Sequence, residues 1–111
     1  MPAASSRSDF FLVVRFWVAP DAELEVRRWL EGGHVAEVVS QPGFLWCRRL
    51  KLEPRDGWAG YAMIYGIESP AAYAAYEANA ALKEKFARER ASFESRMRIE
   101  RFAGEVDFAW E

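Results

Sequence analysis

Apolar positions recur with two different spacings along this chain, and segments with the two spacings follow one another in an order that is repeated. Short, dense apolar runs are typical of buried strands, whereas apolar residues that recur every three or four positions are typical of helices. On this basis the chain contains a strand over 9–19, a helix over 21–40, a strand over 44–52, a strand over 58–67, a helix that begins at Ser69 and Pro70, and a strand over 98–110. The pattern therefore predicts a strand–helix–strand unit that occurs twice.

This order of elements corresponds to the split βαβ, or ferredoxin-like, arrangement. A four-stranded antiparallel sheet then carries two helices on one face, so the expected class is α+β. A chain of 111 residues is long enough for one domain with a single core. We expect residues 1–8 to form a disordered N-terminal tail and residues 9–111 to form that domain.

The first and third strands are apolar on both faces. In the first strand one face carries Phe10, Leu12, Val14, Phe16 and Val18, and the other carries Phe11, Val13 and Trp17, with Arg15 as the exception. A strand with one face in water alternates apolar and polar residues instead. Because the helices cover only one face, a second copy of the chain is the simplest cover for the other. We therefore expect a homodimer whose two sheets form a dimeric α+β barrel.

Three positions predict irregularities within these elements. Gly32 and Gly33 interrupt the first helix, so we expect a kink or two short segments there. The apolar stripe of the second helix changes direction near Leu82, so that helix either bends or is covered from two sides. Gly104 predicts a bulge or bend in the last strand, whose apolar end at Trp110 is expected to dock, on this chain or against a partner subunit.

Composition and charge disfavour several classes of partner. The net charge of −2 gives no electrostatic reason to expect nucleic acid or an anionic membrane. The first apolar run contains Arg15 and ends at Pro20, so it is too short to span a bilayer. Cys47 is the only cysteine, which excludes an intrachain disulfide and fits a reducing compartment. We expect a cytoplasmic protein that contacts neither nucleic acid nor membrane.

The candidate chemistry centres on His34, the only histidine of the chain. No strong catalytic motif is present, and one His with one Cys gives no basis for a metal site, so no metal is expected. Helical spacing puts His34 at the edge of the apolar stripe and Glu37 on the same face, where its carboxylate could hold one imidazole nitrogen. The pair is a candidate general base. The alternative is a helix-terminal histidine bonded to a backbone carbonyl.

Several tyrosines and tryptophans are candidates for binding a substrate. These residues, each of which joins an apolar ring to a polar group, are Tyr61, Tyr65, Tyr73, Tyr76, Trp46 and Trp58. The first two tyrosines share a face of the third strand, and the other two share a stripe of the second helix. Each ring either belongs to the core with its polar group satisfied or lines a pocket as a hydrogen-bond donor.

Four stretches of the chain resemble a known superfamily. They are Trp29, the residues 34–39 that lead into Pro42-Gly43-Phe44, the Tyr73-Ala-Ala-Tyr76 helix, and residues 96–102. In these stretches the chain resembles small bacterial proteins of the dimeric α+β barrel superfamily. The nearest group is a family of largely unknown function, close to the antibiotic-biosynthesis monooxygenases and the polyketide cyclases.

The resemblance implies a homodimer with a pocket between each sheet and its helices that holds an apolar, often aromatic molecule. It also implies a functional role for His34, which matches the histidine at the end of the first helix in that superfamily. Haem-handling members exist as well. Haem is not expected here, because His34 would have to be the proximal ligand and there is no second histidine. No other cofactor is expected.

The leading hypothesis is a small-molecule enzyme, either a cofactor-independent monooxygenase or a cyclase or isomerase, that acts on a hydrophobic aromatic or polyketide-like compound. His34, oriented by Glu37, would be the general base. Tyrosine hydroxyls would position a carbonyl or a phenol. Two alternatives are a non-catalytic protein that binds a small ligand and a structural dimer domain with no pocket. A cavity with His34 pointing into it would favour the enzyme.

Overall fold

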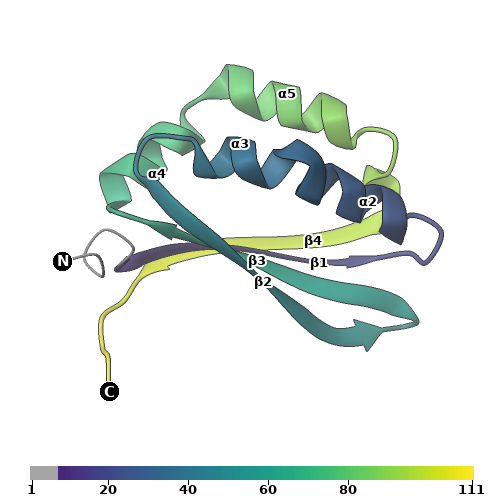
Figure 1. The fold of residues 1–111 in the computed structure, drawn as a ribbon, viewed down its shortest axis with the longest axis horizontal. Coiled ribbons are helices and arrows are strands. Elements are labelled where there is room, and N and C mark those ends of the chain that lie inside the picture. Colours follow the sequence, from purple (N-terminus) through teal and green to yellow (C-terminus); the bar gives the residue numbers. More distant parts are fainter. Residues whose placement is uncertain (1–7) are drawn as a thin grey trace.

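The computed structural model describes residues 8–111, and Figure 1 shows their fold. Four strands form one antiparallel sheet in the order β2-β3-β1-β4. They are β1 (Phe10–Val18), β2 (Phe44–Arg55), β3 (Trp58–Ile67) and β4 (Met97–Glu105). The helices all lie on one face of this sheet (Figure 1). The predicted ferredoxin-like α+β fold is therefore confirmed.

The core lies between the sheet and the helices, because alternate residues of each central strand point toward the helix layer. Its buried apolar residues include Leu12, Phe16 and Val18 from β1, Met63, Tyr65 and Ile67 from β3, and Val26, Leu30 and Val38 from the first helical region, residues 23–39. β1 and β3, which the sequence predicts to be apolar on both faces, thus each contribute one face to this core.

The first helical region is interrupted, as the two glycines predict. It consists of α2 (Glu23–Trp29), a π-helical turn η1 (Leu30–His34) and α3 (Val35–Val39). Gly33 has the non-helical angles φ 159° and ψ −30°. Such π turns inside helices often occur at functional sites. Here the turn ends on His34.

The second helical region is two helices, α4 (Pro70–Glu77) and α5 (Ala80–Arg90), followed by a short 3₁₀ turn η2 (Glu94–Arg96). The Ser69 hydroxyl caps α4 by accepting from the Ala72 N–H at 3.1 Å. The side-chain oxygen Oδ1 of Asn79 caps α5 by accepting from the Leu82 N–H, also at 3.1 Å. The expected bend is therefore a full break, just before Leu82, because Asn79 starts a new helix.

The last strand is shorter and more regular than the sequence predicts. β4 ends at Glu105 and not at residue 110, because its ladder with β1 ends at the pair of Phe10 and Glu105. A further backbone bond of 2.8 Å runs from the Val106 N–H to the Asp9 carbonyl. The register between β1 and β4 contains no shift, and Gly104 pairs with Phe11 within the regular ladder. The predicted bulge at Gly104 is therefore wrong.

The two ends of the described chain differ in their contacts. The Ser8 hydroxyl donates to the Ile67 carbonyl at 2.7 Å, and the rest of the predicted tail over 1–8 lies outside the described residues. After β4 the chain turns away from the sheet (Figure 1), and Phe108 and Trp110 are 77% and 88% exposed. The apolar C-terminal segment therefore does not dock on its own fold.

The sheet face opposite the helices, which we call the outer face, also carries large apolar groups. Trp17 lies against Gly60 and Trp46 lies against Gly66, so closely that any side chain at either glycine would collide with the indole. Glycine at these two positions of β3 is therefore required by packing.

Arginines cover several of the outer-face rings. The Arg55 guanidinium lies 3.6 Å from the centre of a Trp17 ring, and the Arg98 guanidinium lies 4.5 Å from that of Trp58. Such cation–π contacts shield an indole from water while the charge stays hydrated.

Candidate functional site

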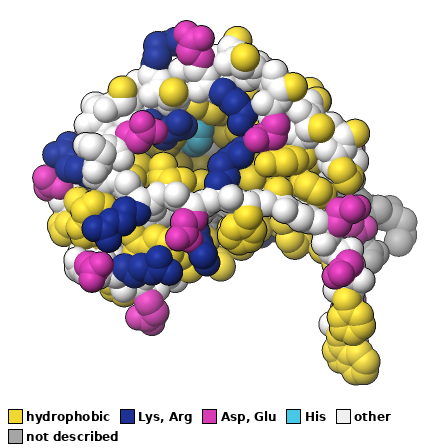
Figure 2. Space-filling view, turned by 180° about the vertical axis from the view of Figure 1, so that it is seen from behind, with side chains coloured by type: hydrophobic (Ala, Val, Ile, Leu, Met, Phe, Trp, Pro, Cys, Tyr) yellow, Lys and Arg dark blue, Asp and Glu magenta, His cyan; other side chains and the backbone are white. Residues whose placement is uncertain are grey.

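A cavity of about 270 Å³ lies between the sheet and the helices. It opens between α5 and β4, where Figure 2 shows the histidine within a hollow flanked by Lys and Arg side chains. The lining residues are Leu12, Val14 and Phe16 from β1, Met63 and Tyr65 from β3, Met97, Ile99 and Arg101 from β4, Trp29, Leu30, His34 and Val38 from the first helical region, Tyr76 from α4, and Lys83, Phe86 and Arg90 from α5. Apolar walls with a few polar groups are typical of small-molecule sites.

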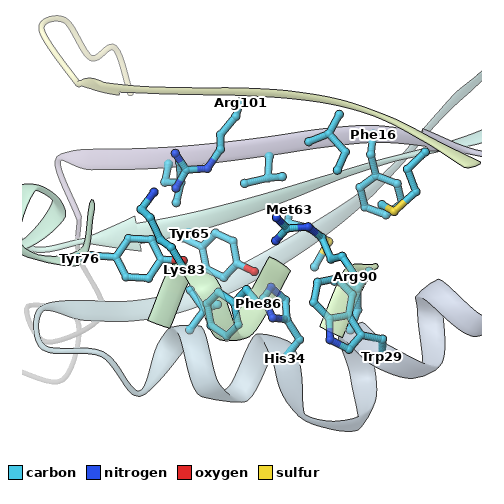
Figure 3. Close-up of a pocket in the computed structure, with 16 residues that line it drawn as sticks. Phe16, Trp29, His34, Met63, Tyr65, Tyr76, Lys83, Phe86, Arg90 and Arg101 are labelled. Carbon is cyan, nitrogen blue, oxygen red and sulfur yellow. The ribbon is translucent and has the colours of Figure 1, made fainter. Parts of the chain in front are cut away.

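His34 is held between two aromatic rings on the helix side of the cavity (Figure 3). Its imidazole stacks on Trp29 with ring centres 3.9 Å apart, and it meets Phe86 edge-on at 4.4 Å. Within residues 8–111, its buried Nδ1 atom has no hydrogen-bond partner. The ring is thus fixed by packing.

Burial controls the protonation of His34. Removal from water disfavours the charged imidazolium and lowers the pKa of His34 from 6.5 to about 4, although the nearby Glu89 carboxylate opposes this shift. His34 is therefore neutral at pH 7. In that state one ring nitrogen can donate a hydrogen bond and the other can accept one or take up a proton.

The carboxylate that the sequence assigns to His34 is engaged elsewhere. Glu37 Oε1 bonds to Nζ of Lys85 on α5, and Glu37 does not line the cavity. The expected hydrogen bond from the imidazole N–H to the Glu37 carboxylate is not formed, because the Glu37 side chain bridges α3 to α5 instead. The Trp29 indole N–H donates to Glu89 at 3.0 Å, and this contact anchors the ring that stacks on the imidazole.

Two of the four candidate tyrosines line the cavity, namely Tyr65 from β3 and Tyr76 from α4 (Figure 3). Burial raises the pKa of both hydroxyls, so they stay protonated and can donate hydrogen bonds. Cys47 pairs with Tyr65 across β2 and β3, and burial likewise raises the pKa of its thiol. That shift makes Cys47 a poor nucleophile.

The other two tyrosines belong to the core around the cavity. The Tyr61 hydroxyl donates to Glu23, and its ring lies 5.6 Å from that of Phe16. Tyr73 packs against Phe10 with ring centres 5.3 Å apart. Neither residue lines the cavity.

Trp46 and Trp58, the two candidate tryptophans, lie on the outer face of the sheet. Trp46 contacts Phe11 at a ring distance of 5.7 Å, and Trp58 lies beneath Arg98. Their positions follow from strand parity, since both alternate with residues that face the helices. The sheet therefore separates them from His34.

Three cationic residues of the cavity were absent from the sequence-based candidates. Lys83 and Arg90 flank Phe86 on one side of α5, at the three- and four-residue spacings that define a helix face. Arg101 occupies a helix-facing position of β4, opposite Val14. The spacing of Lys83 and Arg90 about Phe86 was a detectable signal, because a charge on the face of a buried aromatic residue needs an opening. The inward position of Arg101 follows only from the register between β1 and β4.

Two of these cations share one carboxylate. Arg101 makes bonds of 3.1 and 2.7 Å to the two oxygens of Glu77, and Lys83 makes one of 2.9 Å to the same group. These bonds, chiefly the one from Arg101, lower the pKa of Glu77 to about 2. The cluster ties α4 and α5 to β4 at the mouth of the cavity.

Neither a metal cluster nor a membrane span is found in the described part of the chain. Residues 8–111 contain no group of three or more His, Cys, Asp or Glu side chains arranged to hold a metal ion. Within the same range, no helix is long and apolar enough to cross a bilayer.

Comparison with known proteins bears on the fold. Neither a family model nor a curated protein sequence matches this chain. Among solved structures, a dimeric ferredoxin-like protein from an uncultured marine organism is similar over 91% of this chain and 97% of its own, with a TM-score of 0.62 and 17% identity.

Two further solved structures, both described as enzymes, are similar to this chain. The heme-degrader MhuD from Mycobacterium tuberculosis, with two hemes bound in its active site, is similar over 92% of this chain and 99% of its own, with a TM-score of 0.59 and 21% identity. SnoaB, a cofactor-independent oxygenase from Streptomyces nogalater, covers 92% and 97%, with a TM-score of 0.58 and 19% identity. At these identities the likeness establishes the fold. This chain has the ferredoxin-like α+β fold of these structures, as the resemblance of its sequence to the dimeric α+β barrel superfamily implied.

Proposed function

We propose that this chain is a small-molecule enzyme that removes a proton from a hydrophobic, aromatic compound held in the cavity. The observation that carries this proposal is the placement of His34, which is neutral, half-buried and pointed into the cavity (Figure 3). Proton removal is the step that a cofactor-independent oxygenation, a cyclisation and an isomerisation have in common.

The low pKa of His34 is compatible with this role when the substrate carries developing negative charge. With a pKa of about 4 the imidazole is unprotonated at pH 7 but only weakly basic. A negative charge within a few ångströms favours the imidazolium and raises its pKa. The base therefore becomes stronger as charge builds up on the substrate, and this is an interaction realised mainly in the transition state.

The remaining lining residues suit an aromatic compound that bears an oxygen. Trp29 and Phe86 offer ring surfaces beside His34. The hydroxyls of Tyr65 and Tyr76 are protonated donors that can bond a carbonyl or phenolate oxygen. The similar structures described as a heme-degrader and as a cofactor-independent oxygenase support a monooxygenase-like function for this chain.

The residues fit a haem less well. The cavity of about 270 Å³ is at the low end of ligand pockets and smaller than a tetrapyrrole requires. No step is therefore assigned to haem.

We also propose that a second copy of the chain covers the outer face. Phe102 and Leu50 there are 52% and 49% exposed, and the C-terminal segment adds Phe108 and Trp110. Exposed apolar areas of this kind mark interaction surfaces. The described dimeric relative supports the same assembly.

The enzymatic role is tested by a thermal-stability screen of phenols, naphthols and polycyclic aromatic ketones against wild type and His34→Gln. The glutamine keeps a polar side chain but cannot act as a base. We expect hits to stabilise both proteins, while the oxygen uptake or absorbance change seen with wild type falls by about 10² to 10⁴ in His34→Gln. Hits without turnover would indicate a non-catalytic binding protein. The absence of hits would indicate a structural domain.

A further inference from the structure

The charges around the cavity are unequally distributed. Lys83, Arg90 and Arg101 all line it, and none of its lining residues within the described part of the chain is acidic. Figure 3 shows Arg101 on the sheet side and Lys83 and Arg90 on the α5 side, so that the three cations surround the space in front of His34. His34 adds no charge at neutral pH.

The carboxylates that neutralise these cations lie outside the lining. Glu77 binds both Arg101 and Lys83, and Glu94 binds Arg90 at 3.2 Å. Three lining cations thus pair with two carboxylates that lie behind them, and Lys85 on α5, also outside the lining, pairs with Glu37 and Glu89. The neighbourhood has no net positive excess, but an anionic group that entered the cavity would meet the cations first, because the acidic side chains do not line it.

The position of Glu77 indicates how such a ligand would be held. Both oxygens of its carboxylate accept hydrogen bonds from Arg101, in the bidentate geometry by which guanidinium groups recognise carboxylates. The side chains of Glu77 and Arg101 are 30% and 34% exposed, so water and solutes reach the pair. Glu77 occupies the place at Arg101 that the carboxylate of a ligand would need.

We propose that the cavity selects an aromatic compound with one carboxylate, which displaces Glu77 from Arg101 and Lys83 while its ring lies against Trp29. The inference rests on the proposed function, since it names the substrate class of the same cavity. Glu77 then acts as an internal substitute that keeps the two cations paired until the ligand binds. The body of the ligand is directed from the cationic mouth toward His34.

The experiment compares 2-naphthoate with its neutral isostere 2-naphthamide by isothermal titration calorimetry. We expect wild type to bind the naphthoate at least about tenfold more tightly, since a charge-assisted contact replaces a neutral one. Arg101→Gln should remove this preference, and Arg101→Lys should retain part of it. Glu77→Gln should tighten naphthoate binding by removing the competing carboxylate. Glu84→Gln is the matched control, because it changes the net charge equally from a surface pair with Arg88 and should change neither affinity.

The other possible results would overturn carboxylate selection, the displacement of Glu77 or the cavity as a ligand site. Equal affinities of wild type for the two compounds would overturn carboxylate selection and leave the proposed cavity function intact. Weaker naphthoate binding by Glu77→Gln would show that Glu77 holds Arg101 in place, and would overturn the displacement. Binding of neither compound would count against the cavity as a ligand site and thus against the proposed function itself. Should Arg101→Gln fail to fold, the Arg101→Lys and Glu77→Gln comparisons decide the question.

Discussion

The two faces of the sheet are formed by the same four strands, yet they use the same residue types differently. On the helix side, Trp29 forms a wall of open space, and Arg101 reaches a carboxylate beside that space. On the outer face, Trp17 fills the gap above Gly60 while Arg55 lies over its ring. Tryptophan and arginine therefore indicate a site only where the packing leaves room.

The space on the helix side follows from interruptions of the helices. The π turn that ends at His34 lies at the cavity, and the break between α4 and α5 falls between Tyr76 and Lys83, which both line it. On the outer face, Trp17 and Trp46 lie against Gly60 and Gly66 and fill the space there. An apolar face of this second kind is suited to another protein surface.

The largest expected effect contrasts a phenylalanine from each face. Phe16 is 2% exposed, so Phe16→Ala should lower the free energy of unfolding by about 3–5 kcal/mol. Phe102 is 52% exposed, and Phe102→Ala should cost less than about 1 kcal/mol at dilutions where the chain is monomeric. Urea unfolding at low protein concentration measures both. Equal costs would show that the two faces do not differ in burial.

The next effect concerns association through the outer face. Phe102→Glu or Trp110→Glu should raise the dissociation constant of the dimer by about 30-fold or more, since a charge replaces a buried aromatic contact. Leu24→Glu on α2 is the control, because Leu24 is also an exposed apolar residue, at 59%, but lies on the helix side. Sedimentation velocity gives the constants. A monomer mass for wild type at micromolar concentration would refute the dimer, and an unchanged Trp110→Glu would remove the C-terminal segment from the interface.

The smallest effect depends on pH and belongs to the helix side alone. Because burial lowers the pKa of His34 to about 4, the unfolded chain binds this proton at higher pH than the folded chain does. The free energy of unfolding should therefore fall by about 2 kcal/mol as the pH is lowered from 6.5 to 4.5. His34→Gln should flatten this window in urea titrations. The same slope in both proteins would assign the titration to another group.

Much of the fold could be predicted because it depends on local periodicity. The strands around Phe16 and Tyr65 and the helix start at Ser69 follow from residue spacing and capping. The end of β4 could not be derived in this way, since it depends on where β1 begins. Likewise, Asn79 could be seen as a poor residue for a helix interior, but only the structure shows it capping a new helix.

The site was less predictable, because side-chain partners are set by neighbouring elements. His34 was identified from the spacing within one helical region, but the Glu37 carboxylate of the same region bonds to Lys85 on α5. Trp46 was counted as a candidate without regard to which face of the sheet it occupies. Arg101 was missed for the converse reason, since its inward parity becomes visible only when the register with β1 is known.

The proposed binding site is the helix-side cavity with His34 in its wall. NMR can follow the imidazole signals of His34 during a titration with 2-naphthoate, and these signals are unambiguous because the chain has one histidine. We expect a saturable shift of the His34 and Trp29 ring signals, while the indole of Trp58 on the outer face stays unchanged. Shifts at Trp58 with His34 unmoved would contradict the proposed site.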